Sequence, residues 1–408
     1  MKHFIKIAPL IFLLFSTSAF PLGEGGISTD GGISEGVGTI HGQNWWHYGL
    51  TFWAPLDNPD SPLRLERGAG SFTFTRAHDA THTGTYLHPG TEWVTVADNN
   101  QLRIEAGGAL IEGARTNSLL WSRTFDNAAW VKTNTTVAAN QVGEDGVDNT
   151  AYTLTASDAN GTLCQNVTAD NVAYTGSFSI KRIAGTGAVQ ISLDNGASYG
   201  SDLAGSLSTL AWYRASKANQ TLPNPTLCLR LATSGDNVII DYAQIEAGAF
   251  ASSRIPTTTA AVTRNADALT VPTAGIIDNA VGTIYLEVNK GAGNPAGQAA
   301  YPIALSAASG IDSASGSMRV RDGTGAPGTA WNDANQHKAA IRWGAGEMAI
   351  VLDGGVISTD AFDGSMNAAA DMYIGSKNGV DYPIFGHVRN IRAWNRAFTD
   401  AEIQAVTQ

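Results

Sequence analysis

The chain of 408 residues carries a formal net charge of −11, with 45 glycines and only 15% charged residues. This length is typical of two or three domains, and the acidic balance, together with the lack of any run rich in lysine and arginine, argues against nucleic acids as partners. Segments rich in Thr, Ser, Asn and Val between turn residues indicate an all-β protein with many tight turns.

Residues 1–19 have the composition of a secretory signal peptide. Lys2 and Lys6 precede an apolar run over residues 7–15, and the small residues Thr17 and Ala19 follow it. The run is too short to span a bilayer, so a lipid-exposed N-terminal helix is the less favoured alternative. We therefore predict cleavage after Ala19, a protein secreted to the extracellular space or the cell surface, and no membrane span in the mature chain.

Residues 20–116 are predicted to form a linker and an irregular leader. His78 and His82, with Asp79 and His88 close by, have a spacing that serves a metal best on a helix, but the surrounding Thr and Gly favour solvated loop histidines. The phrases FTFTRAHDAT and GALIEGARTNSLLWS resemble a leader of phage tail-fibre and related secreted bacterial proteins. In those proteins the leader precedes a carbohydrate-binding-module-like sandwich.

Residues 117–256 contain short alternating segments at regular spacing. A typical segment, 173–180, places its aromatic and aliphatic residues on one face and its hydroxyl residues on the other. Such segments with turn signals between them predict a sandwich of two sheets. FDNAAWVK, AWYRA and IIDYAQIEAGAFASSRIPT together resemble a galactose-binding-like jelly roll of the kind used as a carbohydrate-binding module. This resemblance implies that Trp130 and Trp212 are core residues.

Residues 266–408 follow a Thr- and Ala-rich linker and predict a second sandwich. Its closing strand has a bulge near Arg389, and Thr399 with Glu402 has the form of a capping box that begins a short helix. The run HKAAIRWGAGEMAIVLDGG and the final W-N-R-A segment resemble laminin-G-like (concanavalin A-like) jelly rolls, which implies that Trp394 packs against the terminal helix. The predicted fold is all-β, with two tandem antiparallel jelly-roll sandwiches after the signal peptide and the leader.

Catalytic chemistry is not indicated by the sequence. A glycosidase needs two carboxyl groups that face one sugar bond, and no strand carries them at alternate positions. Asp241 and Glu246 share a strand but differ in parity, and His337 and His387 have no nearby acid pair of the kind that marks a lyase site. We therefore expect no enzyme, and a polysaccharide-cleaving activity is the least favoured function.

No cofactor is expected either. A calcium ion bound by loop carboxylates is the alternative, and the candidate ligands are Asp322, Asp333, Asp353, Asp360 and Asp381. Because no dense D-x-D-x-D spacing supports a cage, solvated loop aspartates are the favoured interpretation.

The two cysteines, Cys164 and Cys228, pose a separate question. An exported protein favours a disulfide. Strand alternation places both side chains on the outer faces of their strands, where they can bond only if the two strands are neighbours in one sheet. We predict two free, partly exposed thiols.

The favoured function is non-catalytic, lectin-like binding of extracellular or cell-surface glycans by exposed aromatic rings. Trp331 with Asn332 and Asp333, and Tyr382 with Asp381, lie in segments of loop composition and are the candidate glycan contacts. The competing interpretation, which is slightly favoured over ligand contact, folds each ring over its own sandwich edge. The alternative function is a structural or adhesion module of a phage tail fibre or surface assembly, which would place the protein on a virion or a cell surface. The sequence does not indicate which glycan is bound or the oligomeric state.

Overall fold

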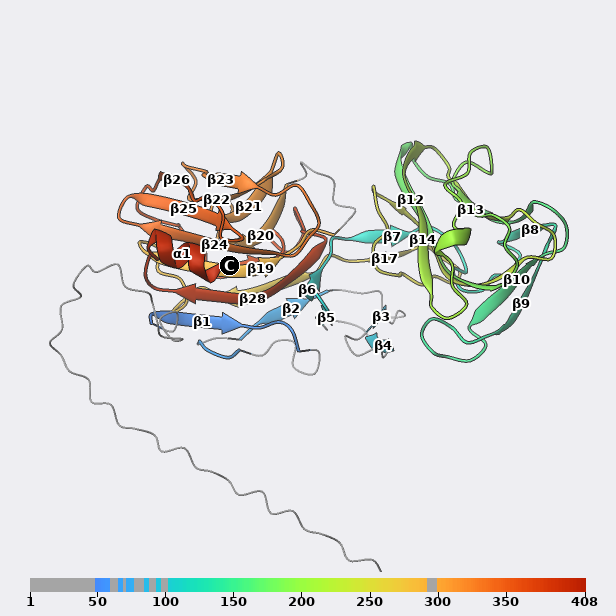
Figure 1. The fold of residues 1–408 in the computed structure, drawn as a ribbon, viewed down its shortest axis with the longest axis horizontal. Helices are drawn as coiled ribbons and strands as arrows, with labels where there is room; N and C mark the ends of the chain where they lie inside the picture. The colour runs from blue at the N-terminus through green and yellow to red at the C-terminus, as the bar shows by residue number, and fades with distance from the viewer. Residues whose placement is uncertain are drawn as a thin grey trace, which may run out of the picture. The chain divides into compact units, whose positions relative to one another are not determined.

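The computed structural model describes residues 48–58, 65–68, 71–76, 84–87, 93–96, 102–291 and 299–408. Within these ranges the regular structure is nearly all antiparallel β-strand, with a single α-helix, α1 (Asp400–Val406) (Figure 1). The prediction of an all-β chain is confirmed. No helix in the same ranges is long and apolar enough to cross a membrane. The predicted cleavage site at Ala19 and the histidine group of His78, His82 and His88 lie outside the described residues.

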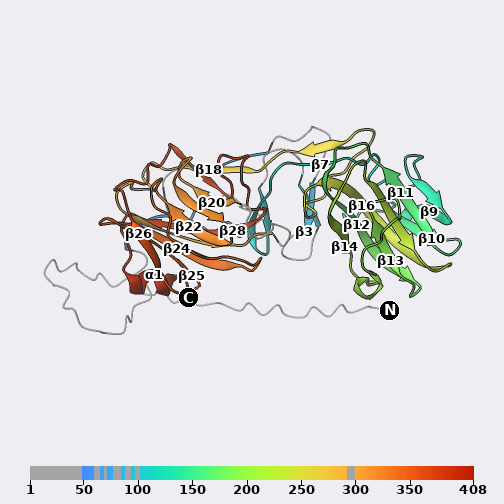
Figure 2. The same cartoon turned by 90° about the horizontal axis from the view of Figure 1, so that it is seen from above.

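The middle sandwich consists of a five-stranded and a four-stranded sheet (Figure 2). The five-stranded sheet has the order β14 (Tyr213–Leu222), β12 (Val172–Ala184), β16 (Asn237–Ala247), β10 (Ala151–Ala156) and β9 (Thr135–Gln141). The four-stranded sheet has the order β13 (Val189–Ser192), β15 (Thr226–Leu231), β11 (Gly161–Asn166) and β8 (Val131–Thr133).

The core of the middle sandwich lies between these sheets, each of which turns alternate residues inward. Trp130 is 1% exposed, and its ring centroid lies 5.1 Å from that of Phe125 and 6.0 Å from that of Phe178. The core position implied for Trp130 is therefore confirmed. Trp212 differs: it is half-buried and lies outside this core, with Nζ of Lys181 5.7 Å from the centroid of its ring.

The C-terminal sandwich also has two sheets. The larger has the order β26 (Ser358–Ala361), β25 (Glu347–Leu352), β24 (His337–Gly344), β19 (Gly282–Val288), β28 (Gly386–Trp394), β6 (Gly108–Ile111) and β5 (Arg103–Glu105), and β1 (Leu50–Ala54) also pairs with β28. The smaller has the order β2 (Thr73–Thr75), β18 (Ala268–Pro272), β27 (Asp371–Ile374), β20 (Ala300–Ala304), β21 (Gly310–Ala314), β22 (Ser317–Arg321) and β23 (Gly328–Ala330).

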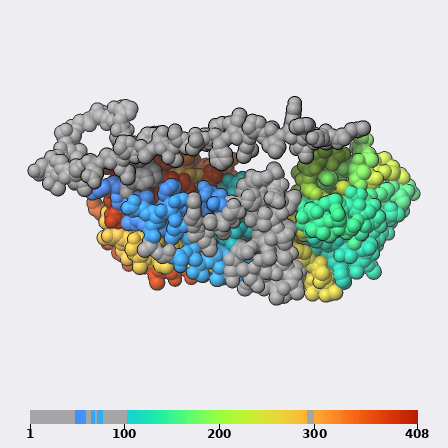
Figure 3. Space-filling view, turned by 90° about the horizontal axis from the view of Figure 1, so that it is seen from below, coloured from blue at the N-terminus to red at the C-terminus, as the bar shows by residue number. Residues whose placement is uncertain are grey.

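Four of these strands come from the segment that the sequence interprets as an irregular leader. β1, β2, β5 and β6 precede the middle sandwich in the chain, yet they pair within the sheets of the C-terminal sandwich. Phe52 of β1 pairs with Ala393 of β28 and is fully buried in the C-terminal core. Figure 3 shows the blue atoms of the early strands among the yellow, orange and red atoms of this sandwich. The middle sandwich is therefore an insertion into the C-terminal one.

The insertion is bounded by a two-stranded ribbon in which β7 (Arg115–Asn117) pairs with β17 (Val262–Arg264). A further two-stranded pair, β3 (Gly84–Leu87) with β4 (Trp93–Val96), belongs to the same early part of the chain. The strand partner of β1, β28, lies more than three hundred residues further along the sequence. A local hydrophobic pattern carries no information about such distant partners, so the leader strands could not be assigned to a sheet from sequence.

The closing segment of the chain has the form predicted for it. β28 bulges opposite β19, because Glu287 pairs with Arg389 while Tyr285 pairs with Arg392. Thr399 and Glu402 complete the capping box of α1, with each side chain bonded to the backbone N–H of the other residue. The ring of Trp394 is buried and lies 4.7 Å from that of Phe398, in the cluster that α1 covers.

The prediction of two free thiols is wrong, since Cys164 and Cys228 form a disulfide. Both side chains do point away from the sandwich core, as alternation predicts. However, β11 and β15 are neighbours in the four-stranded sheet, and their register sets the two cysteines directly opposite each other with Cα atoms 4.1 Å apart. At that separation a cross-strand pair is within bonding reach.

Candidate functional site

Trp331 does not have the exposed position that its loop composition predicts. Its side chain is 1% exposed and packs in the core of the C-terminal sandwich. Nζ of Lys290 lies 4.5 Å from the centroid of the ring and donates a hydrogen bond of 2.8 Å to the carbonyl oxygen of Trp331. The predicted stacking face is therefore absent, and the ring covers its own sandwich. Its neighbours Asn332 and Asp333 remain exposed.

Asp333 belongs to a charged cluster around His337. Its Oδ1 lies 2.7 Å from Nε2 of His337, while Oδ2 of Asp353 lies 2.5 Å from Nδ1 of the same ring. Burial opposes protonation of His337, but the hydrogen bonds to Asp353 and Asp333 outweigh it and raise the pKa of the imidazole above its ordinary value. The two carboxylates are thus bonded to His337 and tie the loop after β23 to the turn after β25.

The other calcium candidates accept hydrogen bonds from N–H groups, and Asp322 and Asp360 accept some of them from distant loops. Oδ1 of Asp322 accepts hydrogen bonds of 2.8 Å from the backbone N–H groups of Thr324 and Gly325. Asp360 accepts a bond from a backbone N–H, and Asp381 accepts one from the Asn378 amide. Among the residues that the structure describes, no group of three or more His, Cys, Asp or Glu side chains is placed to hold a metal ion.

Tyr382 keeps the exposed position predicted for it. Its side chain is 48% exposed, its ring centroid lies 5.9 Å from that of Tyr301, and Nζ of Lys377 lies 5.6 Å from the same centroid. Asp381 beside it is also exposed. This loop precedes β28, whereas Trp331 follows β23, and within the described part of the chain the two predicted groups share no hydrogen bond or ring contact.

A groove of about 330 Å³ lies on the outer face of the four-stranded sheet in the middle sandwich, and we call it the sheet-face groove. This volume is in the range of small-molecule sites, which starts at about 300 Å³. The lining residues are Val131, Thr133, Thr162, Cys164, Asn166, Asn195, Tyr199, Thr226 and Cys228. They supply hydroxyls, amides, one aromatic ring, one exposed valine and the disulfide.

The register of the sheet explains why these side chains lie together. Cys228 of β15 is opposite Cys164 of β11, and Cys164 is opposite Val131 of β8. Residues directly opposite in antiparallel strands share a face, and residues two apart along a strand share it as well. The disulfide and Val131 therefore form one row across the floor of the groove, and parallel rows flank it on either side.

The flanking rows are polar. One carries side chains from all four strands, in the order Gln190, Arg230, Thr162 and Thr133. The other contains the opposed pair Asn166 and Thr226, in which Nδ2 of Asn166 donates a bond of 2.9 Å to Oγ1 of Thr226. A sheet face that faces solvent favours such residues, but two polar rows around an apolar floor also match the alternating polar and apolar surfaces of a sugar ring.

The loop over residues 193–200 supplies the remaining wall and is held by Asp194. Oδ1 of Asp194 accepts bonds from Oγ of Ser192 at 2.6 Å and from the backbone N–H of Ser198 at 2.9 Å, and Oδ2 accepts from Nε2 of Gln220 at 3.1 Å. Burial opposes a charge on Asp194, but the bonds from Ser192 and Ser198 outweigh it and lower its pKa. The charged carboxylate therefore fixes the loop that presents Asn195 and Tyr199.

Tyr199 is stacked against Arg230 at one end of the groove. Cζ of Arg230 lies 3.9 Å from the centroid of the Tyr199 ring, and Nη2 of Arg230 donates to Oε1 of Gln190 on the neighbouring strand. Both contacts hold the guanidinium in place, so ring and charge are pre-organised beside the groove.

The groove offers hydrogen-bonding groups and apolar contacts. None of its nine lining residues is a carboxylate or a histidine. Hydroxyls and amides donate and accept hydrogen bonds, and the Tyr199 ring and Val131 offer apolar contact. This combination suits a ligand rich in hydroxyl groups with apolar ring faces.

Two buried carboxylates elsewhere, Glu112 and Asp241, are bonded to arginines. Oε2 of Glu112 accepts bonds of 2.6 Å from Arg103 and 2.8 Å from Arg264, and these cations lower the pKa of Glu112 although burial opposes the charge. Asp241 accepts two bonds of 2.8 Å from Arg123, and burial raises its pKa. Asp241 lies on β16, in the sheet opposite the groove.

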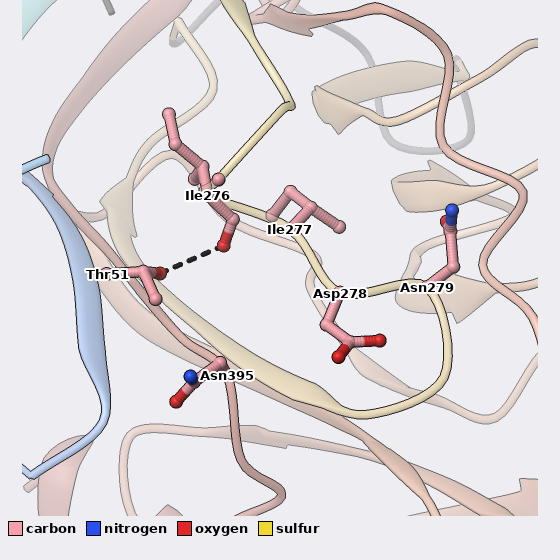
Figure 4. Close-up of a pocket in the computed structure, with 7 residues that line it drawn as sticks. Thr51, Ile276, Ile277, Asp278, Asn279 and Asn395 are labelled. Carbon is pink, nitrogen blue, oxygen red and sulfur yellow. Dashed lines mark hydrogen bonds between the residues drawn. The ribbon is translucent and has the colours of Figure 1, made fainter. Parts of the chain in front are cut away.

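A second hollow, of about 500 Å³, lies at one end of the C-terminal sandwich (Figure 4). Thr51 of β1, the loop over 275–279 and Asn395 line it, and Oγ1 of Thr51 donates a bond of 2.9 Å to the carbonyl of Ile276. Asp278, the carboxylate among its lining residues, accepts a bond from the N–H of Ala280. No aromatic side chain lines this hollow, so it lacks the stacking surface that the sheet-face groove has.

Sequence reasoning missed the groove, although part of its signal was present. Tyr199 stands in LDNGASYG, a segment of turn composition that could have been recognised as an aromatic-bearing loop. The rows of Thr162, Asn166 and Thr226 depend on which strands are neighbours, and neighbours cannot be read from periodicity. The prediction of free thiols failed for the same reason, because the sequence does not show that the strands of Cys164 and Cys228 are neighbours.

No family model matches the sequence, and no curated protein matches it. Solved structures similar to part of the chain include the binding domain of botulinum neurotoxin DC in complex with SialylT, at 12% identity and a TM-score of 0.29, and the botulinum neurotoxin type G receptor binding domain, at 11% and 0.28. Each match covers 35% of the present chain and 39% of the neurotoxin chain. At such low identity and TM-score the likeness carries no argument about function, and the resemblances to laminin-G-like and tail-fibre proteins stay predictions.

Proposed function

We propose that the protein is a non-catalytic, secreted glycan-binding protein and that the sheet-face groove is its principal binding surface. The observation that carries this proposal is the three-row arrangement of the groove, in which polar rows flank an apolar floor beside the Tyr199 ring. A pyranose presents hydroxyls at its edge and C–H groups on its faces, so it can bond to the rows while its face contacts the ring or the floor.

The disulfide supports the secreted location. Disulfides persist in oxidising compartments and are rare in reducing ones, and the bond between Cys164 and Cys228 joins adjacent strands under the groove. The signal-peptide pattern over residues 1–19 supports the same location independently.

The test combines a glycan array with an assay for released reducing sugar. We expect binding of the mature protein to a restricted set of glycans and no release of sugar ends. Tyr199→Ala should weaken binding about tenfold, which corresponds to the loss of one aromatic contact, and the melting temperature should stay close to that of the native protein. Tyr213→Ala is the matched control, because Tyr213 is 38% exposed but lies on the other sheet.

Two results would contradict this proposal. Full binding by Tyr199→Ala, or equal losses from Tyr199→Ala and Tyr213→Ala, would show that the groove is not the binding surface. Release of reducing ends by the mature protein, absent from a mock purification, would show an enzyme.

Tyr382 and Asp381 are proposed as a second, separate contact for the same class of ligand. The support is the exposed ring of Tyr382 beside Tyr301, with the Lys377 ammonium close to both rings at 5.6 and 5.7 Å. If both sites bind one polymer, Tyr382→Ala should weaken binding to a polysaccharide and leave binding to a single short oligosaccharide in the groove unchanged, since the link between two sites acts through effective concentration.

A further inference from the structure

We infer that the sheet-face groove selects glycans that carry an anionic substituent, a carboxylate or a sulfate, and that Arg230 is the residue that binds this substituent. The inference rests on the proposed function and names the class of ligand for the same site. Three observations support it: the place of Arg230 at the groove, the hydrogen-bond partners of its side chain, and the lack of carboxylates among the residues that line the groove.

Arg230 stands at the groove by register. It lies on β15 two residues beyond Cys228, directly opposite Thr162 of β11, and both Cys228 and Thr162 line the groove. The side chain therefore projects from the same face of the sheet as the floor. Its stacking on Tyr199, at 3.9 Å from Cζ to the ring centroid, places the guanidinium beside an aromatic residue of the groove wall.

Arg230 also lacks the carboxylate partner that most other arginines of the middle sandwich have. Arg123, Arg182 and Arg254 of the middle sandwich form ion pairs with carboxylates, and so does Arg115 of the bounding ribbon. Arg214 instead donates to Oγ of Ser177 and to the carbonyl of Ser252. Within the described residues Arg230 forms no ion pair: its Nη2 donates to the neutral amide of Gln190, and its Nε is buried without a hydrogen-bond partner. No carboxylate in the part of the chain that the structure describes neutralises this guanidinium, so its charge can bind a ligand oxyanion.

The surroundings leave this charge available. No carboxylate lines the groove, and Asp194, in the wall loop, is occupied by Ser192, Ser198 and Gln220. Because the whole chain has a net charge of −11, general attraction to polyanions is not expected. Selection for an acidic sugar must then come from a local group, and the planar guanidinium bonds well to carboxylate and sulfate oxygens.

The test compares matched polymers. Polygalacturonate is set against its carboxyl-reduced, neutral counterpart, and a sulfated galactan against its desulfated form, each titrated with the full mature protein. We expect the anionic member of at least one pair to bind ten- to hundredfold more tightly, the size of effect expected for a charge-assisted hydrogen bond, and to lose affinity as salt is added. The pair that shows the difference identifies carboxylate or sulfate.

Arg230→Gln should abolish the preference, so that the anionic and the neutral polymer bind equally, while the melting temperature stays near that of the native protein. Arg230→Lys keeps the positive charge but loses the paired N–H donors of the planar guanidinium, so it should retain a reduced preference for the anionic polymer. Lys181→Gln, which removes one positive charge from the opposite sheet, is the matched control and should bind as the native protein does.

The outcomes separate the inference from the proposed function. Equal binding of anionic and neutral polymers, or a preference that survives Arg230→Gln, overturns the inference and leaves glycan binding in the groove intact. An array on which no glycan binds the native protein, with the variants equally silent, overturns both. If Arg230→Gln loses all binding and its melting temperature falls strongly, Arg230 has a structural role. Arg230→Lys then decides: a normally folded Arg230→Lys that shows no preference for the anionic polymer overturns the inference.

Discussion

Cys164 and Cys228 lie directly opposite each other on β11 and β15, and the bond between them forms the floor of the sheet-face groove. The disulfide thus joins two strands that are 64 residues apart in the sequence, at the surface where we propose that glycans bind. Its effects on stability and on binding can be separated, because the flanking polar rows do not depend on the sulfur atoms for their hydrogen bonds.

The first prediction concerns the oxidation state. Thiol titration of the denatured, unreduced protein should find no free thiol. Replacing both residues, Cys164→Ser with Cys228→Ser, should lower the free energy of unfolding by about 2–4 kcal/mol, because a cross-link mainly restricts the unfolded chain. Two titratable thiols in the native preparation would contradict the bond, and native protein treated with a reductant serves as the positive control.

The second prediction concerns Trp331 and follows from its buried position. Because its ring is 1% exposed in the core of the C-terminal sandwich, Trp331→Ala should lower the free energy of unfolding by about 3–5 kcal/mol. Glycan binding by the folded fraction should be unaffected. Chemical denaturation with a binding assay below the midpoint tests both statements, and a stable variant that fails to bind would restore Trp331 as a ligand contact.

The sequence predicted features that depend on neighbouring residues, and it failed for features that depend on distant segments. Local signals were sufficient for the Thr399 capping box, the bulge near Arg389 and the outward parity of the cysteines, since each depends on residues close together in the chain. The disulfide and the groove depend on which strand lies beside which, and that is decided by packing between distant segments. The buried ring of Trp331 agrees with the competing interpretation from sequence, because a loop of turn-forming residues can still turn one ring inward.

The third prediction concerns the early strands. Phe52 of β1 is fully buried against a sandwich whose other strands mostly follow residue 266, so Phe52→Ala should lower the free energy of unfolding by about 3–5 kcal/mol. Tyr48→Ala, at a side chain 77% exposed just before β1, should change it by at most about 0.5 kcal/mol. Equal, small effects from both variants would mean that β1 does not contribute to the core.

The last prediction is a dependence of stability on pH that arises from His337. Its hydrogen bonds to Asp353 and Asp333 raise its pKa in the folded protein although burial opposes protonation. The folded state therefore binds more protons than the unfolded state near neutral pH, so the free energy of unfolding falls as pH rises. The stabilisation is fully present below the unfolded pKa of about 6.5 and is lost as pH rises through the higher folded pKa.

His337→Gln keeps a side chain that can hydrogen-bond but cannot titrate, so its unfolding free energy should change less than that of the native protein across this window. Asp353→Asn removes one of the two charges that hold the proton, and it should shift the titration of the His337 ring, followed by nuclear magnetic resonance, to lower pH. Parallel stability curves for the native protein and His337→Gln, or a ring that titrates below its ordinary value, would show that the cluster does not hold a proton. Since the cluster ties the loop after β23 to the turn after β25 in the C-terminal sandwich, glycan binding in the middle sandwich should remain unchanged by either variant.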